Sequence, residues 1–560
     1  MSTAAHLAKA GFKVTVFEKN NYTGGRCSLL HHEGYRFDQG PSLLLLPDLF
    51  QEAFNDLDTS LEAENVRLIK CEPNYRIHFG DGESFTLSTD LAQMKKEIEK
   101  WEGKGGFERY LQFLQEAHVH YESSVTHVLK RNFYSVFSML RPGFVRYLLA
   151  LHPFVSIWSR ASKYFYTERL RRVFTFGSMY MGMSPFNAPG TYSLLQYTEL
   201  AEGIWYPEGG FNMIVQALER VGKRMGVEYR LGTPISSIAL SSDGKTAKGV
   251  TLPSGETITA DVTIINADLV YAYNNLLPNS SYAKTLASKP ASCSSFSFYW
   301  ALDRKIPELD THNIFLADDY RESFDDIFNR QQLPTQPSFY LNVPSRVDPT
   351  AAPKGKDSIV VLVPCGHLLS DEEGSGLKPQ DWTEMLDRAR STVIGMIEKR
   401  TGVRNLKAAI VHEKVNTPES WRDEFNLDKG AILGLSHSFF NVLCFRPRNK
   451  HASIAGLYFS GASTHPGTGV PICLAGARIT SEEVLQDSGE RIPWGKGLQG
   501  IEDEGISGRT GEGGKRLDRV ERGLGRFWWV VQVLITMVIG VLAQMMYSSK
   551  AVTMPVLLKR

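Results

Sequence analysis

Residues 456–471 read GLYFSGASTHPGTGVP, and this stretch decides the fold of the chain. The apolar run 457–459 predicts a strand, a turn rich in glycine and proline follows it, and residues 472–477 predict a helix. In such a corner the backbone N–H groups at the start of the helix face a ligand, and glycines let the backbone approach it closely. The alternative interpretation is an ordinary strand–turn–helix corner. Two further segments favour a ligand site.

The N-terminal segment fits the same kind of site. Residues 2–11 predict a helix that ends at a glycine, and residues 13–19 predict a strand that contains Glu18 near its end. A carboxylate at this place in a dinucleotide-binding fold binds the ribose hydroxyls of adenosine. The Gly-Gly-Arg run at 24–26 follows. Its glycines let a loop cross close to a flavin, and its arginine suits a diphosphate, although a plain turn is the other interpretation.

A third segment, GIWYPEGGF at residues 203–211, precedes a predicted helix and a strand over 227–231. Pro234 and Ile235 come next. This order predicts a second return of the chain to the nucleotide-binding domain, and Ile235 is a further candidate for cofactor binding.

The order of these motifs resembles phytoene desaturases of the bacterial and fungal type, over roughly the first 490 residues. That family is FAD-dependent and belongs to the amine-oxidase-like flavoproteins. The Thr-His-Pro-Gly run at 464–467 is the specific part of the resemblance, and broader relatives carry an acid where this chain has Ala462. The segments 266–268 and 445–449 also match. The resemblance implies FAD as cofactor, bound by Glu18, Gly24, Gly25, Arg26, Ile235, Gly461, Gly467, Gly469 and Pro471.

The implied fold class is α/β. It combines a Rossmann-like FAD-binding domain of the amine-oxidase-like flavoprotein type, an interleaved α+β substrate domain and a C-terminal transmembrane helix. Alternation at 295–302 and 358–363 predicts strands of a sheet that floors a cavity. The expected boundaries are 1–70, 203–275 and 430–487 for the FAD-binding domain, 71–202 and 276–429 for the substrate domain, 488–526 for a flexible linker and 527–547 for the transmembrane helix.

The chain departs from the family at its start. Members begin with a strand and a GxGxxG turn that cradles the FAD diphosphate, whereas this sequence opens inside the helix that follows. We therefore expect a truncated gene model, a misplaced start or a short isoform. Without that first strand, the neighbouring strand edges are expected to be unpaired, and FAD binding by this polypeptide becomes a question for experiment.

Composition argues against two classes of site. The net charge of +1 over 560 residues gives no electrostatic basis for binding nucleic acid. The six cysteines are scattered, with no CxxC and no Cys/His cluster in the sequence, so no metal site is expected and a reducing compartment is indicated.

The C-terminal segment predicts a membrane anchor. Residues 527–547 carry no charge and are long enough to span a bilayer, with Trp528, Trp529 and Tyr547 near its ends. A buried C-terminal helix is the alternative. Basic residues are more frequent before the span than after it, which favours a cytoplasmic catalytic domain. The endoplasmic reticulum is a candidate membrane.

The resemblance implies stepwise desaturation of phytoene towards lycopene or more desaturated carotenes, with hydride transfer to the flavin. The expected partners are an apolar polyene, membrane lipid, and quinone or oxygen as electron acceptor. The pocket should be long and apolar, and residues 174–185 are candidates for its wall. Glu168, Arg171 and His465 are the catalytic candidates. The first two would manage the leaving proton unless they belong to a solvated helix face, and His465 would touch the flavin unless it caps a helix.

Sequence spacing does not separate this reaction from those of a carotenoid isomerase, a ketolase or a retinol saturase of the same family. A catalytically inactive, membrane-tethered relic is a different class of hypothesis, and the absent GxGxxG turn favours it. A soluble amine oxidase is disfavoured, because its aromatic cage and acidic flavin residue are not evident in the sequence.

Overall fold

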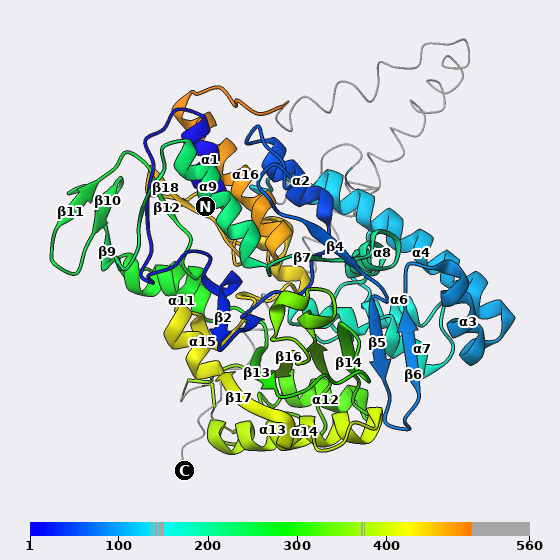
Figure 1. The fold of residues 1–560 in the computed structure, drawn as a ribbon. Coiled ribbons are helices and arrows are strands. Elements are labelled where there is room, and N and C mark those ends of the chain that lie inside the picture. Colours follow the sequence, from blue (N-terminus) through cyan, green and yellow to red (C-terminus); the bar gives the residue numbers. More distant parts are fainter. Residues whose placement is uncertain (136–137, 140–143, 145–149, 371–372, 375, 496–560) are drawn as a thin grey trace, which may run out of the picture. The chain divides into compact units, whose positions relative to one another are not determined.

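The computed structural model describes residues 1–495 except 136–137, 140–143, 145–149, 371–372 and 375 (Figure 1). The predicted transmembrane segment and most of the predicted linker lie outside the described residues. Within the described part of the chain, no helix combines the length and the apolar character that crossing a bilayer requires.

Two pairs of short parallel strands form the nucleotide-binding part. β1 (Thr15–Phe17) pairs with β8 (Glu228–Arg230), and β12 (Thr263–Ile265) pairs with β18 (Leu457–Phe459). β1, β8 and β18 lie where the sequence predicts them. Among the described residues no strand joins the two pairs, and residues of β1 and β12 line the same cavity.

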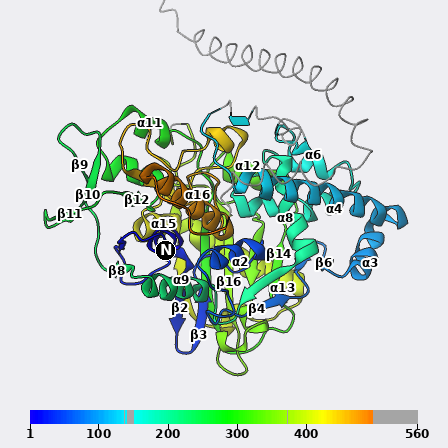
Figure 2. The same cartoon turned by 90° about the horizontal axis from the view of Figure 1, so that it is seen from above.

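Three helices pack beside these strands. α16 (Val470–Ser488) follows β18 through the glycine-rich turn and contacts α1 (Ser2–Lys9), which also contacts α9 (Asn212–Arg224). Figures 1 and 2 both show these helices close together. On α9 the apolar residues recur at helical spacing and form a stripe that packs with apolar residues of α2 (Pro47–Asn55).

A seven-stranded mixed sheet forms the second part of the fold. Its order is β17-β13-β16-β15-β14-β5-β6, and every neighbouring pair is antiparallel except β14 with β5. The strands predicted at 295–302 and 358–363 are β13 and β16, which confirms this prediction. The bounds are β5 (Tyr75–His78), β6 (Ser84–Leu87), β13 (Ser294–Leu302), β14 (His312–Phe315), β15 (Phe339–Asn342), β16 (Ser358–Cys365) and β17 (Ile410–Asn416).

The two faces of this sheet have different neighbours, because side chains alternate along a strand. On β13, Phe298 and Trp300 pack with apolar side chains of α13 (Trp382–Thr401). Ser297, which lies between the core residues Phe296 and Phe298, lines the cavity, and Leu362 of β16 does the same. The sheet therefore floors the cavity on one face, as the sequence predicts.

A helical part completes the described fold near β5 and β6 (Figure 1). α3 (Leu91–Glu102) packs against α4 (Lys104–Ser124), and both share an apolar core with β5 and β6. The strands of the two parts alternate along the chain, whereas the domain boundaries remain a prediction. Other elements are β2 (Leu29–His32), β3 (Tyr35–Asp38), β4 (Leu68–Cys71), β7 (Ile204–Pro207), β9 (Ser237–Leu240), β10 (Ala247–Thr251), β11 (Thr257–Thr259), α6 (Ile157–Ala161), α7 (Glu168–Val173), α8 (Leu194–Tyr197), α10 (Leu269–Tyr271), α11 (Ser281–Ala287), α12 (Tyr320–Phe328), α14 (Leu406–Ala409) and α15 (Pro418–Phe425).

Candidate functional site

A cavity of about 1580 Å³ is lined by both strand pairs, the glycine-rich loops and one face of the seven-stranded sheet. The residues predicted to bind the cofactor come from segments far apart in the sequence. All of them line this cavity: Glu18, Gly24, Gly25, Arg26, Ile235, Gly461, Gly467, Gly469 and Pro471. The fold therefore brings the predicted cofactor residues together at one site.

The first glycine-rich loop requires glycine at position 24, where the structure leaves no room for a side chain. Gly24 has a φ of 97°, in the left-handed region, and a Cβ atom there would lie 2.9 Å from Cγ1 of Val215. A larger residue is excluded by both backbone and packing. Two positions later, the Arg26 guanidinium donates a hydrogen bond to the carbonyl of Ile432. This contact fixes the arginine at the cavity wall.

Glu18 directly follows β1. Its Oε1 accepts a hydrogen bond from the Asn20 N–H at 2.9 Å, so the carboxylate is held by its own turn. The side chain lines the cavity. A carboxylate placed directly after a parallel strand suits the hydroxyls of a ribose.

The second glycine-rich loop passes close to other groups. Gly467 has a φ of 147°, and a Cβ atom there would lie 2.6 Å from Nε2 of His437. That nitrogen accepts a hydrogen bond from the Thr468 N–H at 3.1 Å. At Gly461 a Cβ atom would lie 3.1 Å from Nδ2 of Asn266. The loop is thus a narrow backbone cradle with no room for side chains at these glycines.

α16 begins at this cradle. Its N-cap Gly469 lines the cavity, as do the residues of its first turn, 470–473. Pro471 occupies the first turn, where a missing N–H costs nothing. The N-terminus of a long helix carries a partial positive charge and unpaired N–H groups, which suits an anionic or strongly polar ligand.

Arg446 holds the loop that precedes α16. It is 2% exposed, and its guanidinium donates to the carbonyls of Thr464 at 2.9 Å, Asn441 at 2.8 Å and Ser436 at 3.2 Å. Burial lowers the pKa of Arg446 to about 10. The segment 445–449, which the resemblance singles out, therefore positions the cofactor-facing loop.

Another part of the cavity wall is apolar. Four residues of the predicted stretch 174–185 line it, namely Phe176, Met179, Tyr180 and Met181. Apolar residues of the sheet, such as Leu362, complete this wall. A long hydrocarbon fits such a surface, because it offers nothing to hydrogen-bond.

The predicted catalytic residues are not among those that line the cavity. Glu168 is 61% exposed in its side chain and pairs with Arg172 at 2.5 Å. Arg171 donates to the carbonyl of Phe165 at 2.8 Å. His465 is buried, and its Nε2 lies 2.6 Å from the carbonyl oxygen of Arg131. All three engage protein groups rather than the cavity.

Sequence reasoning missed the buried link between two of its own motifs. Asp38 accepts hydrogen bonds from the Tyr206 hydroxyl and the Phe211 N–H, both at 2.7 Å. Burial raises the pKa of Asp38 to about 6. The polar and glycine residues around Asp38 and Tyr206 were the only sequence feature that pointed to this link. Periodicity in the sequence does not relate two segments that lie so far apart.

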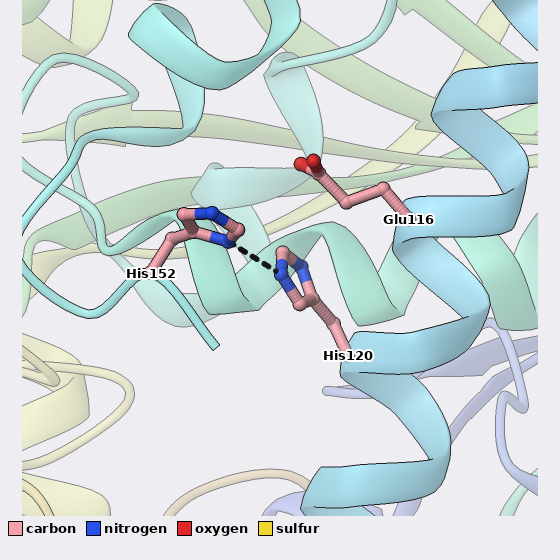
Figure 3. Close-up of side chains that lie close together, drawn as sticks. All are labelled: Glu116, His120 and His152. Atoms are coloured by element: carbon pink, nitrogen blue, oxygen red, sulfur yellow. Dashed lines mark hydrogen bonds between the residues drawn. The ribbon is translucent and has the colours of Figure 1, made fainter. Parts of the chain in front are cut away.

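A second cluster, formed by Glu116, His120 and His152, has potential metal ligands within 4.8 Å of one another (Figure 3). His120 Nε2 lies 3.1 Å from His152 Nδ1. The carboxylate of Glu116, however, accepts hydrogen bonds from both Nε, at 2.8 Å, and Nη2 of Arg160. A divalent cation would have to displace this arginine from its ion pair, so the cluster carries no metal assignment.

The comparisons with known proteins identify the family of the chain. The family of flavin-containing amine oxidoreductases matches residues 1–485. A phytoene desaturase of Cercospora nicotianae is 56% identical, over 97% of this chain and 96% of its own length. One from Fusarium fujikuroi is 62% identical, over 88% of this chain and 89% of its own length. A zeta-carotene-forming phytoene desaturase of Myxococcus xanthus is 38% identical, over 87% and 92%.

Solved structures show the fold. An oxidoreductase from Methanosarcina mazei aligns with a TM-score of 0.55 at 16% identity, over 86% of this chain and 97% of its own. A putrescine oxidase bound to putrescine aligns with a TM-score of 0.54 at 13% identity, over 87% and 96%. With 485 residues matched by the family and relatives above 50% identity, the chain belongs to the flavin-containing amine oxidoreductases.

Proposed function

We propose that the protein is an FAD-dependent oxidoreductase acting on CH–CH bonds, which desaturates phytoene towards lycopene or more desaturated carotenes. The observation that carries the proposal is the convergence of all predicted cofactor residues on a cavity that continues along an apolar wall. Relatives at 56% and 62% identity are phytoene desaturases by name, which supports the same substrate here.

The glycine cradles and the N-terminus of α16 fit a flavin nucleotide. Glu18 would bind ribose hydroxyls, Arg26 would pair with the diphosphate, and the backbone at Gly461 and Gly467 would pass close to the ring system. FAD supplies the oxidising equivalents when bound. The residues of the chain hold the cofactor, orient the polyene along the apolar wall and exclude water from the reacting carbons.

The first test adds FAD and phytoene to the purified 560-residue chain. Flavin absorbance and the appearance of visible carotenoid absorption should both follow. Gly467→Ala should weaken FAD binding about 5- to 150-fold, because its Cβ would lie 2.6 Å from His437 Nε2 on a backbone with positive φ, a strain of about 1–3 kcal/mol. Gly395→Ala is the matched control, since a Cβ there meets nothing within 4 Å.

Either of two results would overturn this proposal. Failure of the full-length chain to bind FAD would favour the inactive relic. Bound flavin with unchanged phytoene would favour another substrate of the same fold, and the products formed from other carotenoids or retinol would then identify it.

We also propose that residues 527–547 anchor the protein in a membrane, with the catalytic part on the cytoplasmic side and the endoplasmic reticulum as its location. The uncharged length and the flanking aromatic and basic residues support this. The full-length chain should float with liposomes, and a chain that stops at residue 526 should not. Equal flotation of both would refute the anchor, and protease treatment of sealed microsomes tests the orientation.

Quinone or oxygen is the proposed final electron acceptor. Under anaerobic conditions turnover should stop after the bound flavin is reduced. Resumption with a soluble quinone alone would select quinone, and resumption only with oxygen would select oxygen.

A further inference from the structure

A directional chain of hydrogen bonds leads out of the apolar part of the cavity. Tyr180 lines the cavity, and its hydroxyl donates to the hydroxyl of Tyr75 at 2.5 Å. The Tyr75 hydroxyl in turn donates to Oε1 of Glu199 at 3.2 Å. Each donor points away from the cavity, so protons can shift in that direction without any side chain turning.

The far end of this chain is a deeply buried carboxyl group. Glu199 is 2% exposed and lies in a π-helical turn, Thr198–Glu202. Such turns are rare and occur frequently at functional sites. The amide of Asn74, next to Tyr75, donates to the backbone carbonyl of Glu199 and fixes the turn against β5.

We propose that Tyr180, Tyr75 and Glu199 form a proton relay, in which Tyr180 receives the proton that leaves the polyene during desaturation and Glu199 stores one proton. This inference rests on the proposed desaturase function. Tyr180 would contact the substrate, whereas Tyr75 and Glu199 act through it and are positioning residues.

The step balances as follows in atoms and electrons. One C–H bond of the polyene breaks, its electron pair becomes the new C=C bond, and the neighbouring carbon gives up a hydride to the flavin. The proton goes to the Tyr180 oxygen, the Tyr180 proton goes to Tyr75, and the Tyr75 proton goes to the Glu199 carboxylate. Both tyrosines end neutral, and Glu199 carries one additional proton.

The electrostatics set the pH range in which the relay can accept a proton. Burial raises the pKa of Glu199 to about 8, and the hydrogen bond that Tyr75 donates to the carboxyl group opposes this rise. Burial raises the pKa values of Tyr75 and Tyr180, and the nearby Tyr340 of β15 raises them further. The Tyr340 hydroxyl lies 2.8 Å from His312 Nδ1 on β14. Glu199 accepts a proton only when ionised, so turnover should rise with pH through about 8.

The test measures single-turnover phytoene desaturation by the FAD-loaded full-length chain between pH 6 and 9.5. Glu199→Gln and Tyr75→Phe should each lower the rate about 100-fold, a typical loss for a proton-transfer group, and should abolish the pH inflection. The flavin absorbance should stay unchanged in both. Glu202→Gln, on the same turn, should keep the wild-type rate and profile.

Tyr110→Phe is the matched control for Tyr75→Phe. Tyr110 is equally buried, in the same apolar core, and its hydroxyl has no hydrogen-bond partner in the described part of the chain. Loss of the Tyr110 hydroxyl should leave turnover and the pH profile unchanged.

A readout without substrate tests the carboxyl group directly. The infrared band of a buried carboxylic acid should titrate near pH 8 in the wild type and be absent in Glu199→Gln. A Glu199→Gln variant that keeps the wild-type rate, or that loses rate but keeps the inflection, would overturn the relay. A wild-type chain that binds flavin but leaves phytoene unchanged would instead overturn the proposed function, and with it the role of the relay.

Discussion

Arg446 shows how one buried side chain can fix the geometry of a loop by hydrogen bonds to backbone carbonyls. Its guanidinium presents several N–H groups in a fixed plane, and the carbonyls around it come from the loop before α16, at Thr464, and from an earlier segment, at Ser436 and Asn441. Each carbonyl buried near Arg446 obtains a partner, and the charge is spread over several dipoles. The loop geometry at Thr464 therefore depends on the shape of this side chain and on its charge together.

Arg446→Lys should destabilise the protein by about 3 kcal/mol, because one ammonium group cannot serve carbonyls on opposite sides and each unpaired buried carbonyl costs about 1–3 kcal/mol. Urea denaturation monitored by tryptophan fluorescence measures the change. Arg448→Lys is the control in the same segment, since Arg448 is exposed. A surface change of this kind shifts stability by less than about 0.5 kcal/mol, so equal losses in both variants would contradict the role assigned to Arg446.

At this scale, sequence reasoning succeeds where the requirement is local. The glycines at 461 and 467 could be predicted to line a ligand cavity because a close backbone approach demands glycine within the motif itself, and both line the cavity. The direction of a side chain on a short helix is not local information. α7 has six residues, too few for a periodic pattern, so the sequence left both a catalytic role and a solvated helix face open for Glu168, and in the structure Glu168 is exposed and pairs with Arg172.

Among the elements, the strands β13 and β16 show what patterning can and cannot determine. Their alternation predicts strands with one face against a cavity, and the structure has both. The order of the seven strands depends on pairings between residues hundreds of positions apart, such as β5 with β14. The pattern of apolar and polar residues along one strand does not say which other strand pairs with it. The strands β13 and β16 could therefore be predicted, whereas the order of the seven strands could not.

α13 offers an element-scale test of this packing. Ile397 is fully buried against the sheet, whereas a Cβ atom at Gly395 meets nothing within 4 Å. Ile397→Ala should cost about 2–5 kcal/mol through lost burial and a cavity. Gly395→Ala should stabilise the helix by about 0.5–1 kcal/mol. Thermal unfolding of both variants checks the pair, and a stability gain at 397 or a loss at 395 would contradict the assigned faces of α13.

At the scale of the whole molecule, the candidate site exists only where separated stretches of the chain meet. The predicted cofactor residues come from the first part of the sequence, from the region after β8 and from the region after β18. Motif order predicts that such stretches converge. The Tyr180–Tyr75–Glu199 chain joins a 3₁₀ helix, a strand and a π-helical turn, and no motif marks it. Convergence of recognisable motifs is thus predictable, whereas polar networks between unmarked segments require the structure.

Buried carboxyl groups should make the stability of the molecule depend on pH in an unusual direction. Burial raises the pKa of Glu483 to about 7 and that of Glu199 to about 8. In the unfolded chain such groups have released their protons above about pH 4.5. The folded state therefore holds protons that the unfolded state does not, and the stability that this contributes is lost as pH rises through 7 and 8. The buried histidines His78 and His465, whose pKa values burial lowers to about 4, oppose this fall at the lower end of the window, because histidines of the unfolded chain still hold part of their protons near pH 6.5.

The free energy of unfolding should accordingly fall between pH 6.5 and 8.5, by about 1.4 kcal/mol per pH unit for each carboxyl group that stays protonated over that interval. Glu199→Gln removes one of these groups, so its stability should decline less steeply by about that amount, while Glu202→Gln should follow the wild type. Urea titrations of the three proteins at pH 6.5, 7.5 and 8.5 give the slopes. Because this measurement uses neither flavin nor substrate, a Glu199→Gln slope equal to that of the wild type would show that Glu199 is already ionised in the folded protein, whatever the reaction the protein catalyses.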